Sequence, residues 1–327
     1  MPYTVTLDVH KRETQACIAN ATGQLIRETR FRTTAKSYKK ALKKYADGPA
    51  ILECVGFYRP VAAWLEQLGF DVHLAHVGKI PKPRLKTDKK DAHHLLRLWR
   101  GDALPEAYLP PQEVQRLRDI ARHRMFLGQQ SRRLKSKLKQ DLNKHGHFLK
   151  TNPVETKKGR EFLQKVDAPE IQSTLRLLDI VLAEQEELQA RIEQETTELP
   201  EAQLLMTVPG IGAYTALLIL GEVGDFSRFD TGDHLGAYAG LVPSQHQSGD
   251  HDRKGSITKE GNPILRWALV EAARNHVMHC PDSRLTKRYE EMAEKKGHAK
   301  AIVATARVLV TVLKAMVEKK EGFKVNP

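Results

Sequence analysis

The chain has 327 residues, of which 53 are Lys or Arg and 40 are Asp or Glu, so its formal net charge is +13. This length allows two or three domains with substantial cores. A clustered positive charge of this size favours polyanionic partners, above all DNA or RNA. The three cysteines show no CxxC spacing, which predicts neither a zinc site nor a disulfide framework and suits a reducing cytoplasm.

The sequence predicts no contact with a membrane. No apolar run reaches the ~20 residues that a membrane-spanning helix needs. The best candidate, 301–317, contains Arg307 and Lys314, which is typical of an amphipathic helix. Because the N-terminus enters a strand-like segment at once, we also expect no signal peptide, and therefore a cytoplasmic protein.

The first hundred residues predict three strands joined by short turns, followed by alternating helices and strands. The predicted strands are Tyr3–Val9, Thr14–Ala19, Gln24–Phe31, Ala50–Cys54 and Phe70–Ala75, and the predicted helices are Ser37–Tyr45 and Arg59–Leu68. We therefore expect an α/β domain with a mixed sheet over residues 1–110. Its order of elements resembles that of the ribonuclease H fold.

Four carboxylates fall where such a domain would bring them together. Asp8 interrupts the first strand, Glu53 ends the fourth, and Asp88 and Asp91 lie three apart at the start of a predicted helix. Carboxylate oxygens are the ligands that Mg²⁺ prefers, and two such ions promote phosphodiester cleavage. Taken singly, each acid is more typical of a surface residue or, for Asp88, of a helix N-cap.

Residues 111–200 predict a linker of two long helices. The first, Gln112–Phe148, carries many cations and few acids, which favours contact with RNA or DNA over a merely solvated surface. The second is acidic with an approximate heptad of Leu and Ile, so the pair forms either a helical hairpin or a coiled coil able to dimerise. The cations that we assign to nucleic acid in these residues and in the preceding proline-containing loop are Arg132, Arg133, Lys135, Lys137 and Lys86, although Lys86 fits a solvated connector equally well.

Residues 201–327 predict helices with glycine-rich breaks. Val208-Pro-Gly-Ile-Gly212 lies between two apolar helical stretches and is typical of a helix-hairpin-helix. The backbone N–H groups around Gly210 and Gly212 could hold a DNA phosphate without reading its sequence. The alternative is a structural turn between two buried helices.

A polar segment further along contains Ser248 followed by Gly249. We expect this segment to be a loop. A serine in it could attack phosphorus if its proton is removed and nearby cations neutralise the phosphate. Without that context the serine would be an ordinary turn residue. The candidate cations are Arg253, Lys254, Lys259 and Arg266.

In this order, the motifs resemble the DEDD transposases of bacterial insertion sequences that are described as bridge-RNA-guided recombinases. The matching stretches are Asp8-Val-His-Lys11, Glu53 with Gly56, 86–92, 208–212, Arg228-Phe229, 240–243, Ser248-Gly249 and 257–262 with Leu265-Arg266. The resemblance implies a RuvC-like catalytic domain in 1–110, a helical coiled-coil linker in 111–200 and a helical transposase domain in 201–327. One departure is Val55, where the family often has a small hydroxyl residue.

The same resemblance implies roles and partners. Asp8, Glu53, Asp88 and Asp91 would bind Mg²⁺, and Ser248 would be the nucleophile that forms a covalent phosphoserine with DNA. A noncoding guide RNA would pair with target and donor DNA, and the protein would assemble as a dimer or tetramer. Two alternatives remain open: a RuvC-like Holliday-junction nuclease that uses metal-activated water, and a non-enzymatic helix-hairpin-helix DNA-binding protein.

Overall fold

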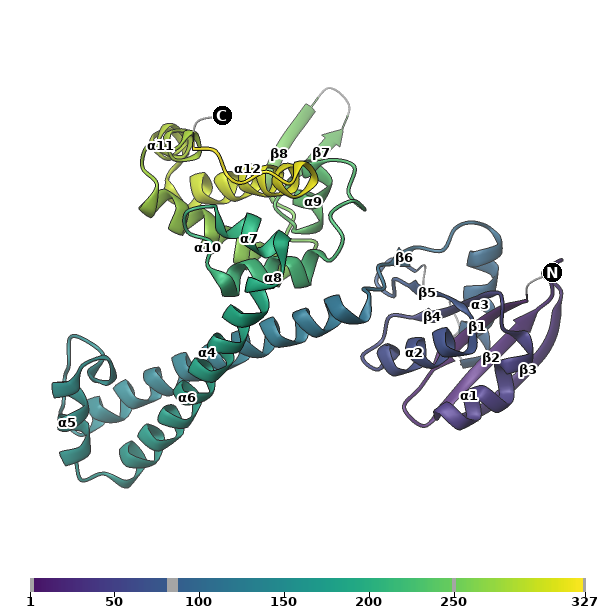
Figure 1. The fold of residues 1–327 in the computed structure, drawn as a ribbon, viewed down its shortest axis with the longest axis horizontal. Coiled ribbons are helices and arrows are strands. Elements are labelled where there is room, and N and C mark those ends of the chain that lie inside the picture. Colours follow the sequence, from purple (N-terminus) through teal and green to yellow (C-terminus); the bar gives the residue numbers. More distant parts are fainter. Residues whose placement is uncertain (1–2, 81–87, 249–250, 326–327) are drawn as a thin grey trace. The chain divides into compact units, whose positions relative to one another are not determined.

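The computed structural model describes residues 3–80, 88–248 and 251–325, without the side chains of residues 88–90 and 245–256. The chain forms two compact units, Met1–Leu109 and Pro110–Pro327 (Figure 1). The segments 111–200 and 201–327 both lie in the second unit, so their separation into two domains stays a prediction. None of the helices among the described residues is long and apolar enough to cross a bilayer.

A six-stranded mixed sheet forms the centre of the first unit, in the order β3-β2-β1-β4-β5-β6. β1 pairs antiparallel with β2 and parallel with β4, and β4 pairs parallel with β5. The predicted mixed sheet is therefore confirmed. The strands are β1 (Thr4–Val9), β2 (Glu13–Ala19), β3 (Leu25–Arg32), β4 (Pro49–Glu53), β5 (Asp71–Ala75) and β6 (Glu106–Ala107).

Helices cover both faces of this sheet. The helices are α1 (Ala35–Leu42), α2 (Tyr58–Leu68) and α3 (Asp88–Arg100), with a 3-10 turn at Lys43–Tyr45. Successive residues of a strand point to opposite faces. Leu7 of β1 accordingly packs with Tyr38 of α1 and Leu65 of α2 in one core, whereas Thr6 lies beneath α3 on the other face. The first face therefore buries an apolar core, and the second face carries Thr6 beside a smaller apolar cluster that includes Ile51 and Leu95.

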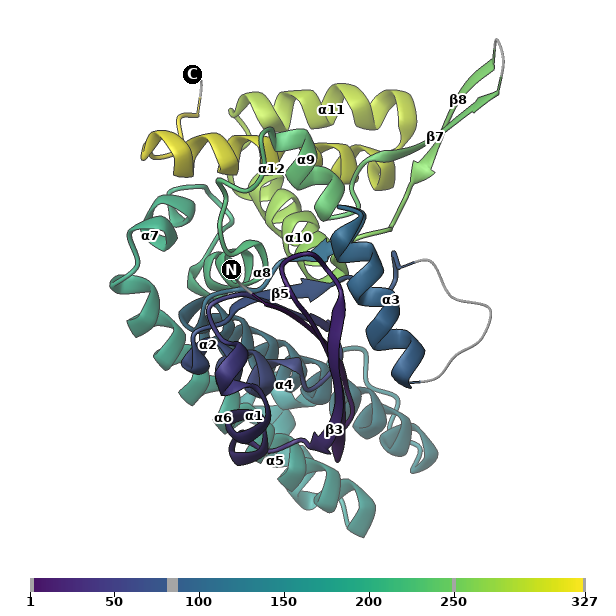
Figure 2. The same cartoon turned by 90° about the vertical axis from the view of Figure 1, so that its right-hand side faces the viewer.

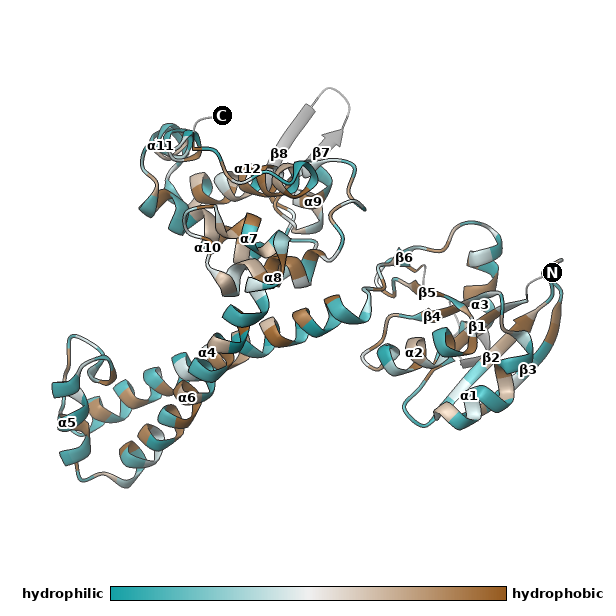
Figure 3. Cartoon of the chain, in the orientation of Figure 1, coloured by the Kyte–Doolittle hydropathy of each residue, from teal (hydrophilic) through white to brown (hydrophobic). Residues whose placement is uncertain are grey.

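The second unit begins with two long helices that run antiparallel (Figure 1). Arg116 near the start of α4 pairs with Glu195 near the end of α6, and Ser131 further along α4 pairs with Gln185 earlier in α6. The two helices therefore run in opposite directions. Figure 3 shows hydrophilic and hydrophobic residues alternating along α4. The pair forms within one chain, and the dimeric coiled coil stays a prediction. The elements are α4 (Gln112–Lys144), α5 (Lys157–Lys165) and α6 (Pro169–Thr197), with a 3-10 turn at Pro153–Glu155.

The remaining helices pack around α8. Every residue of α8 from Ala216 to Val223 is buried, and all of them except Glu222 are apolar, as expected of a helix in the centre of a core. Leu117 and Ile120 at the start of α4 join the same core. The helices are α7 (Pro200–Met206), α8 (Ala213–Val223), α9 (Gly232–Tyr238), α10 (Pro263–His279), α11 (Arg284–Lys296) and α12 (His298–Lys319).

Two strands, β7 (Pro243–Ser248) and β8 (His251–Ile257), form an antiparallel hairpin that projects from these helices (Figure 2). The expectation of a polar loop in an otherwise helical last third is therefore wrong. Apolar alternation reveals a strand only when one face of its sheet is buried. The sequence Pro-Ser-Gln-His-Gln-Ser contains no such alternation, so its pattern indicated a loop.

Candidate active site and nucleic-acid contacts

Asp8 and Glu53 are neighbours at the carboxyl ends of two parallel strands. Leu7 of β1 is in register with Leu52 of β4, so the residues that follow them stand side by side. In parallel strands, residues in register project to the same face. Asp8 shares that face with Thr6, two residues earlier. Both carboxylates therefore belong to the side of the sheet that α3 covers.

The first turns of α3 bring Asp91 to this side. Thr6 donates a hydrogen bond of 2.8 Å from Oγ1 to the main-chain oxygen of Ala92, which ties α3 to β1. One helical turn beyond Asp91, Leu95 packs on Ile51 of β4. Positions four apart share a helix face, so Asp91 faces the sheet as Leu95 does. Asp8, Glu53 and Asp91 thus lie on one side of the sheet.

The environment of Asp8 suits a hard cation. Its side chain is only 11% exposed, and Nε2 of His10 lies 3.2 Å from Oδ2. Glu53 and Asp91 also carry carboxylate oxygens, the donor type that fits Mg²⁺, but the ligand atoms of these three acids do not all lie within 4.8 Å of one another. Asp88 starts α3 as predicted, but its side chain, like the whole of Lys86, lies outside the described residues.

A second group of candidate ligands lies on the same side of the sheet. Within the ranges that the structure describes, Cys17, Glu28 and His93 are the group of three whose ligand atoms lie within 4.8 Å of one another. Cys17 and Glu28 face each other across β2 and β3, and His93 of α3 hydrogen-bonds to Glu28. Cysteine spacing in the sequence could not reveal this group, because its members come from three elements. No disulfide forms between the cysteines of the described residues.

Ser248 belongs to the second unit, where it ends β7. Its side chain and those of Arg253 and Lys254 in β8 lie outside the description, and so does Gly249. The backbone register pairs Ser248 with His251 across the hairpin. The serine therefore stands at the tip of the β7–β8 hairpin, in a unit separate from the three carboxylates.

Arg266 forms hydrogen bonds to the backbone at the base of this hairpin. Its Nη1 donates to the main-chain oxygens of Ala239, at 3.1 Å, and Lys259, at 3.2 Å, on either side of the hairpin. Gly240 lies beneath the guanidinium, where a Cβ would approach Nη1 to 2.5 Å. One edge of Arg266 is thus occupied by backbone. The side chain of Lys259 is exposed, and its residue adopts a positive φ of 55°.

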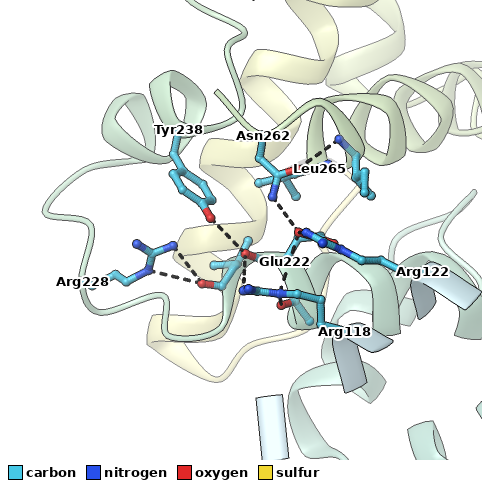
Figure 4. A network of polar contacts seen from close by, with 10 residues as sticks. Arg118, Arg122, Glu222, Arg228, Tyr238, Asn262 and Leu265 are labelled. Atoms are coloured by element: carbon cyan, nitrogen blue, oxygen red, sulfur yellow. Dashed lines mark hydrogen bonds and ion pairs between the residues drawn. The ribbon is translucent and has the colours of Figure 1, made fainter. Parts of the chain in front are cut away.

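A buried carboxylate that the sequence analysis missed links three helices (Figure 4). Glu222 of α8 is fully buried. Arg122 of α4 donates to both of its oxygens, at 2.7 and 2.9 Å, and Asn262 donates to Oε2 at 2.6 Å. Asn262 also caps the N-terminus of α10 by accepting from the N–H groups of Ile264 and Leu265. Glu222 therefore fixes the start of α10, directly after the hairpin, relative to α4.

Several cations of α4 are held by acids from elsewhere in the chain. Arg116 binds Glu113 and Glu195, and these carboxylates raise the pKa of its guanidinium. Among the predicted nucleic-acid contacts, Lys135 pairs with Glu155 at 3.2 Å and Lys137 with Asp141 at 2.7 Å. The basic character of the helix is therefore partly neutralised.

Arg132 and Arg133 differ from these lysines. Both side chains are exposed. Nε of Arg132 donates to the main-chain oxygen of Gly128 at 3.2 Å, which holds the side chain along the helix. Neither arginine forms an ion pair among the salt bridges of the described residues. They are the best placed of the four predicted cations to meet a phosphate.

The Val-Pro-Gly-Ile-Gly segment forms a tight turn between α7 and α8. Gly210 has a φ of 95°, and a Cβ there would lie 2.5 Å from the backbone nitrogen of His276 in α10. Nδ1 of His276 lies 2.9 Å from the oxygen of Pro209, to which it donates, and burial lowers the pKa of this histidine. The close approach of α10 and the positive φ therefore explain why a glycine occupies position 210. Gly212 is exposed, with open space where a Cβ would point, so the N-terminus of α8 is accessible there.

Comparison with known families matches two separate parts of the chain. Residues 5–146 match the DEDD model described as "Transposase", which spans the sheet, the three carboxylates and α4. Residues 202–290 match the model described as "Transposase IS116/IS110/IS902 family", which spans the turn at Gly210 and the β7–β8 hairpin. Each of these two parts of the chain is therefore similar to a family of transposases.

Individual relatives align over parts of their length. The "Transposase for insertion sequence element IS1111A" of Coxiella burnetii is 30% identical over 48% of this chain and 44% of its own length. The "Probable family 20 transposase" of Pseudomonas aeruginosa is 28% identical over 70% of this chain and 71% of its own. The "Pilin gene-inverting protein" of Moraxella bovis is 35% identical over 37% of this chain and 38% of its own. This chain therefore matches less than half of the Coxiella and Moraxella proteins.

Proposed function

We propose that this protein is an active transposase of the IS116/IS110/IS902 family, which cleaves and exchanges DNA strands with Mg²⁺ through a covalent phosphoserine intermediate. The observation that carries the proposal is the convergence of Asp8, Glu53 and Asp91 on one side of the sheet, from three separate elements. Carboxylate oxygens are the ligands that Mg²⁺ prefers. A bound cation supplies the reason for the arrangement.

Asp8, Glu53 and Asp91, joined by Asp88, would hold Mg²⁺ in a RuvC-like catalytic domain. Bound Mg²⁺ would supply positive charge to the phosphate under attack. Ser248 would be the nucleophile. Its oxygen forms a bond to phosphorus while the bond to one sugar oxygen breaks; the serine proton passes to solvent, and the leaving oxygen takes one up. Attack by another strand's hydroxyl reverses these changes and frees the serine, so strands are joined without ATP.

The names of the relatives support this chemistry. The Coxiella protein is named as the transposase of an insertion sequence, and the Moraxella protein is named for inverting a pilin gene. Inversion of a gene requires that strands be cut and rejoined in a new order. A transposase that keeps the phosphodiester bond energy in a phosphoserine accounts for both activities.

The nucleic-acid partners are DNA, as target and donor, and a noncoding guide RNA. Arg132 and Arg133 on α4 would contact RNA backbone, and the accessible N-terminus of α8 at Gly212 would hold a DNA phosphate as a helix-hairpin-helix does. The exposed Lys259 lies at the base of the hairpin that carries Ser248 and would contact DNA. We also propose that α4 and α6 form a coiled-coil linker through which the protein assembles as a dimer or tetramer on DNA.

Strand cleavage tests the proposal. DNA carrying the ends of the element that contains the gene is incubated with protein, Mg²⁺ and RNA transcribed from the flanking sequence. We expect cleavage by the wild type that is lost in Asp91→Asn and in EDTA, and kept in the control Asp71→Asn, an exposed acid in β5. DNA binding without cleavage under every condition would instead make this a non-enzymatic DNA-binding protein.

A further inference from the structure

A groove of about 510 Å³ lies between α4 and the first turns of α10. This volume falls within the range of roughly 300–1,000 Å³ that is typical of small-molecule sites. Its wall on α4 is formed by side chains one or two helical turns apart, and its wall on α10 includes a tryptophan. The lining residues are Met125, Gln129, Arg132, Arg133, Pro263, Ile264 and Trp267.

The two walls are held at a fixed separation. Arg122 of α4 and Asn262, the N-cap of α10, both bind the buried carboxylate of Glu222 (Figure 4). In the sequence, Arg122 precedes Met125, the first lining residue on α4, and Asn262 precedes Pro263, the first lining residue on α10. The groove is therefore built before any ligand arrives, which lowers the entropy lost on binding.

The chemistry of the groove matches an unpaired nucleotide. The indole of Trp267 is 37% exposed, which is unusual for so large an apolar side chain and leaves an aromatic surface open. Arg132 and Arg133 are exposed beside it, and the described residues that line the groove include no acid. Base faces stack on aromatic side chains, and guanidinium groups bind phosphate. The amide of Gln129 adds a donor and an acceptor for a base edge.

We propose that this groove binds one unpaired nucleotide of the nucleic acid on which the transposase acts, with its base stacked on Trp267 and its phosphates beside Arg132 and Arg133. A duplex does not fit this description, because stacking within it hides the base faces. The inference rests on the proposed function in so far as the protein binds nucleic acid. Beyond that function, the inference states that the stacking contact with Trp267 selects strands whose bases are unpaired. The contact does not require a particular base.

Oligonucleotides of about 12 nucleotides, a length within the usual site size, test the proposal with the full chain. The probes are fluorescein-labelled oligo-U, oligo-dT, an abasic strand of the same length and a duplex. The variants are Trp267→Ala, Trp267→Phe and the control Met278→Ala, which changes another exposed apolar side chain further along α10. Arg132→Gln with Arg133→Gln removes the cations. The chain also contains Trp64 and Trp99, so the part of the tryptophan quenching that disappears in Trp267→Ala is the part that reports on this indole.

We expect Trp267→Ala to weaken binding of the base-bearing strands by about tenfold, with loss of quenching, while Trp267→Phe and Met278→Ala bind nearly as the wild type does. The abasic strand and the duplex should not distinguish Trp267→Ala from the wild type, but should bind the double arginine variant more weakly. The tighter of oligo-U and oligo-dT identifies RNA or DNA as the occupant.

Equal binding of base-bearing strands by Trp267→Ala and the wild type would overturn the inference alone. The inference would also be overturned if Trp267→Ala weakened binding of the abasic strand as much as binding of the base-bearing strands. A wild type that binds none of the four probes would overturn the proposed function together with this inference.

Discussion

Thr6 in β1 donates its hydroxyl hydrogen bond to the main-chain oxygen of Ala92 in α3, over 2.8 Å, in a fully buried position. The residues next to this contact are candidate ligands: Asp91 precedes Ala92, and Asp8 follows two residues after Thr6 on the same face. A single hydrogen bond thus sets the helix that carries one carboxylate against the strand that carries another.

We predict that Thr6→Val, which keeps the shape but removes this hydrogen bond, raises the Mg²⁺ concentration needed for half-maximal strand cleavage by about tenfold. The reason is that α3 loses the contact that holds Asp91 opposite Asp8. A Mg²⁺ titration of cleavage measures the change, with Thr4→Val in the same strand as the control. An unchanged Mg²⁺ requirement in Thr6→Val would show that the contact does not position the carboxylates.

A second prediction concerns the stability of the second unit. Glu222→Gln removes the buried charge that Arg122 neutralises, and we expect the free energy of unfolding to fall by about 3 kcal/mol. This value is at the lower end of the destabilisation expected when one partner of a buried ion pair is removed, because the Arg122 side chain is 44% exposed and can be hydrated. Urea unfolding measures it, with the exposed Glu187→Gln as the control. Equal stability of the two variants would contradict a structural role for Glu222.

A third prediction separates the cations of α4. Arg132→Gln with Arg133→Gln should weaken RNA binding and flatten its dependence on salt, because two phosphate contacts are lost. Lys135→Gln with Lys137→Gln should do less, since Glu155 and Asp141 already engage these lysines. Affinity measured over a range of salt concentrations distinguishes the pairs. Identical slopes for both double variants would mean that the intramolecular ion pairs open on binding.

The stability of the second unit should also depend on pH through His276. Burial holds its pKa below the usual 6.5, so the folded protein keeps the ring neutral while the unfolded chain takes up a proton. Its stabilising contribution is therefore complete above about pH 6.5 and is lost as the pH falls through the lower, folded pKa. Urea unfolding at neutral and at mildly acidic pH should show a larger loss for the wild type than for His276→Gln. Equal losses of unfolding free energy in the two proteins would show that His276 does not cause the pH dependence.

The sequence predicted the first unit well because its strands bury one face against α1 and α2. The alternation of Val5, Leu7 and Val9 with polar residues records that burial directly. The placement of Asp8 and Glu53 at strand ends followed from the same pattern. β6 was missed because Glu106–Ala107 is too short to show any period.

The sequence was less informative wherever a partner comes from a distant element. The cations of α4 looked unpaired because Glu195 and Glu222, which bind Arg116 and Arg122, lie far along the chain. The group formed by Cys17 and its partners was hidden for the same reason. The β7–β8 hairpin was hidden differently, since a polar ribbon carries no apolar pattern.

The most direct test of the central claim is a search for the covalent intermediate. The wild type, Ser248→Ala and the control Ser244→Ala are incubated with DNA of the element's ends, Mg²⁺ and the flanking RNA, denatured, and separated by gel electrophoresis with labelled DNA. We predict a protein–DNA adduct for the wild type and Ser244→Ala, and neither adduct nor cleavage for Ser248→Ala. Cleavage by Ser248→Ala without any adduct would contradict the phosphoserine route and would indicate a nuclease that uses water.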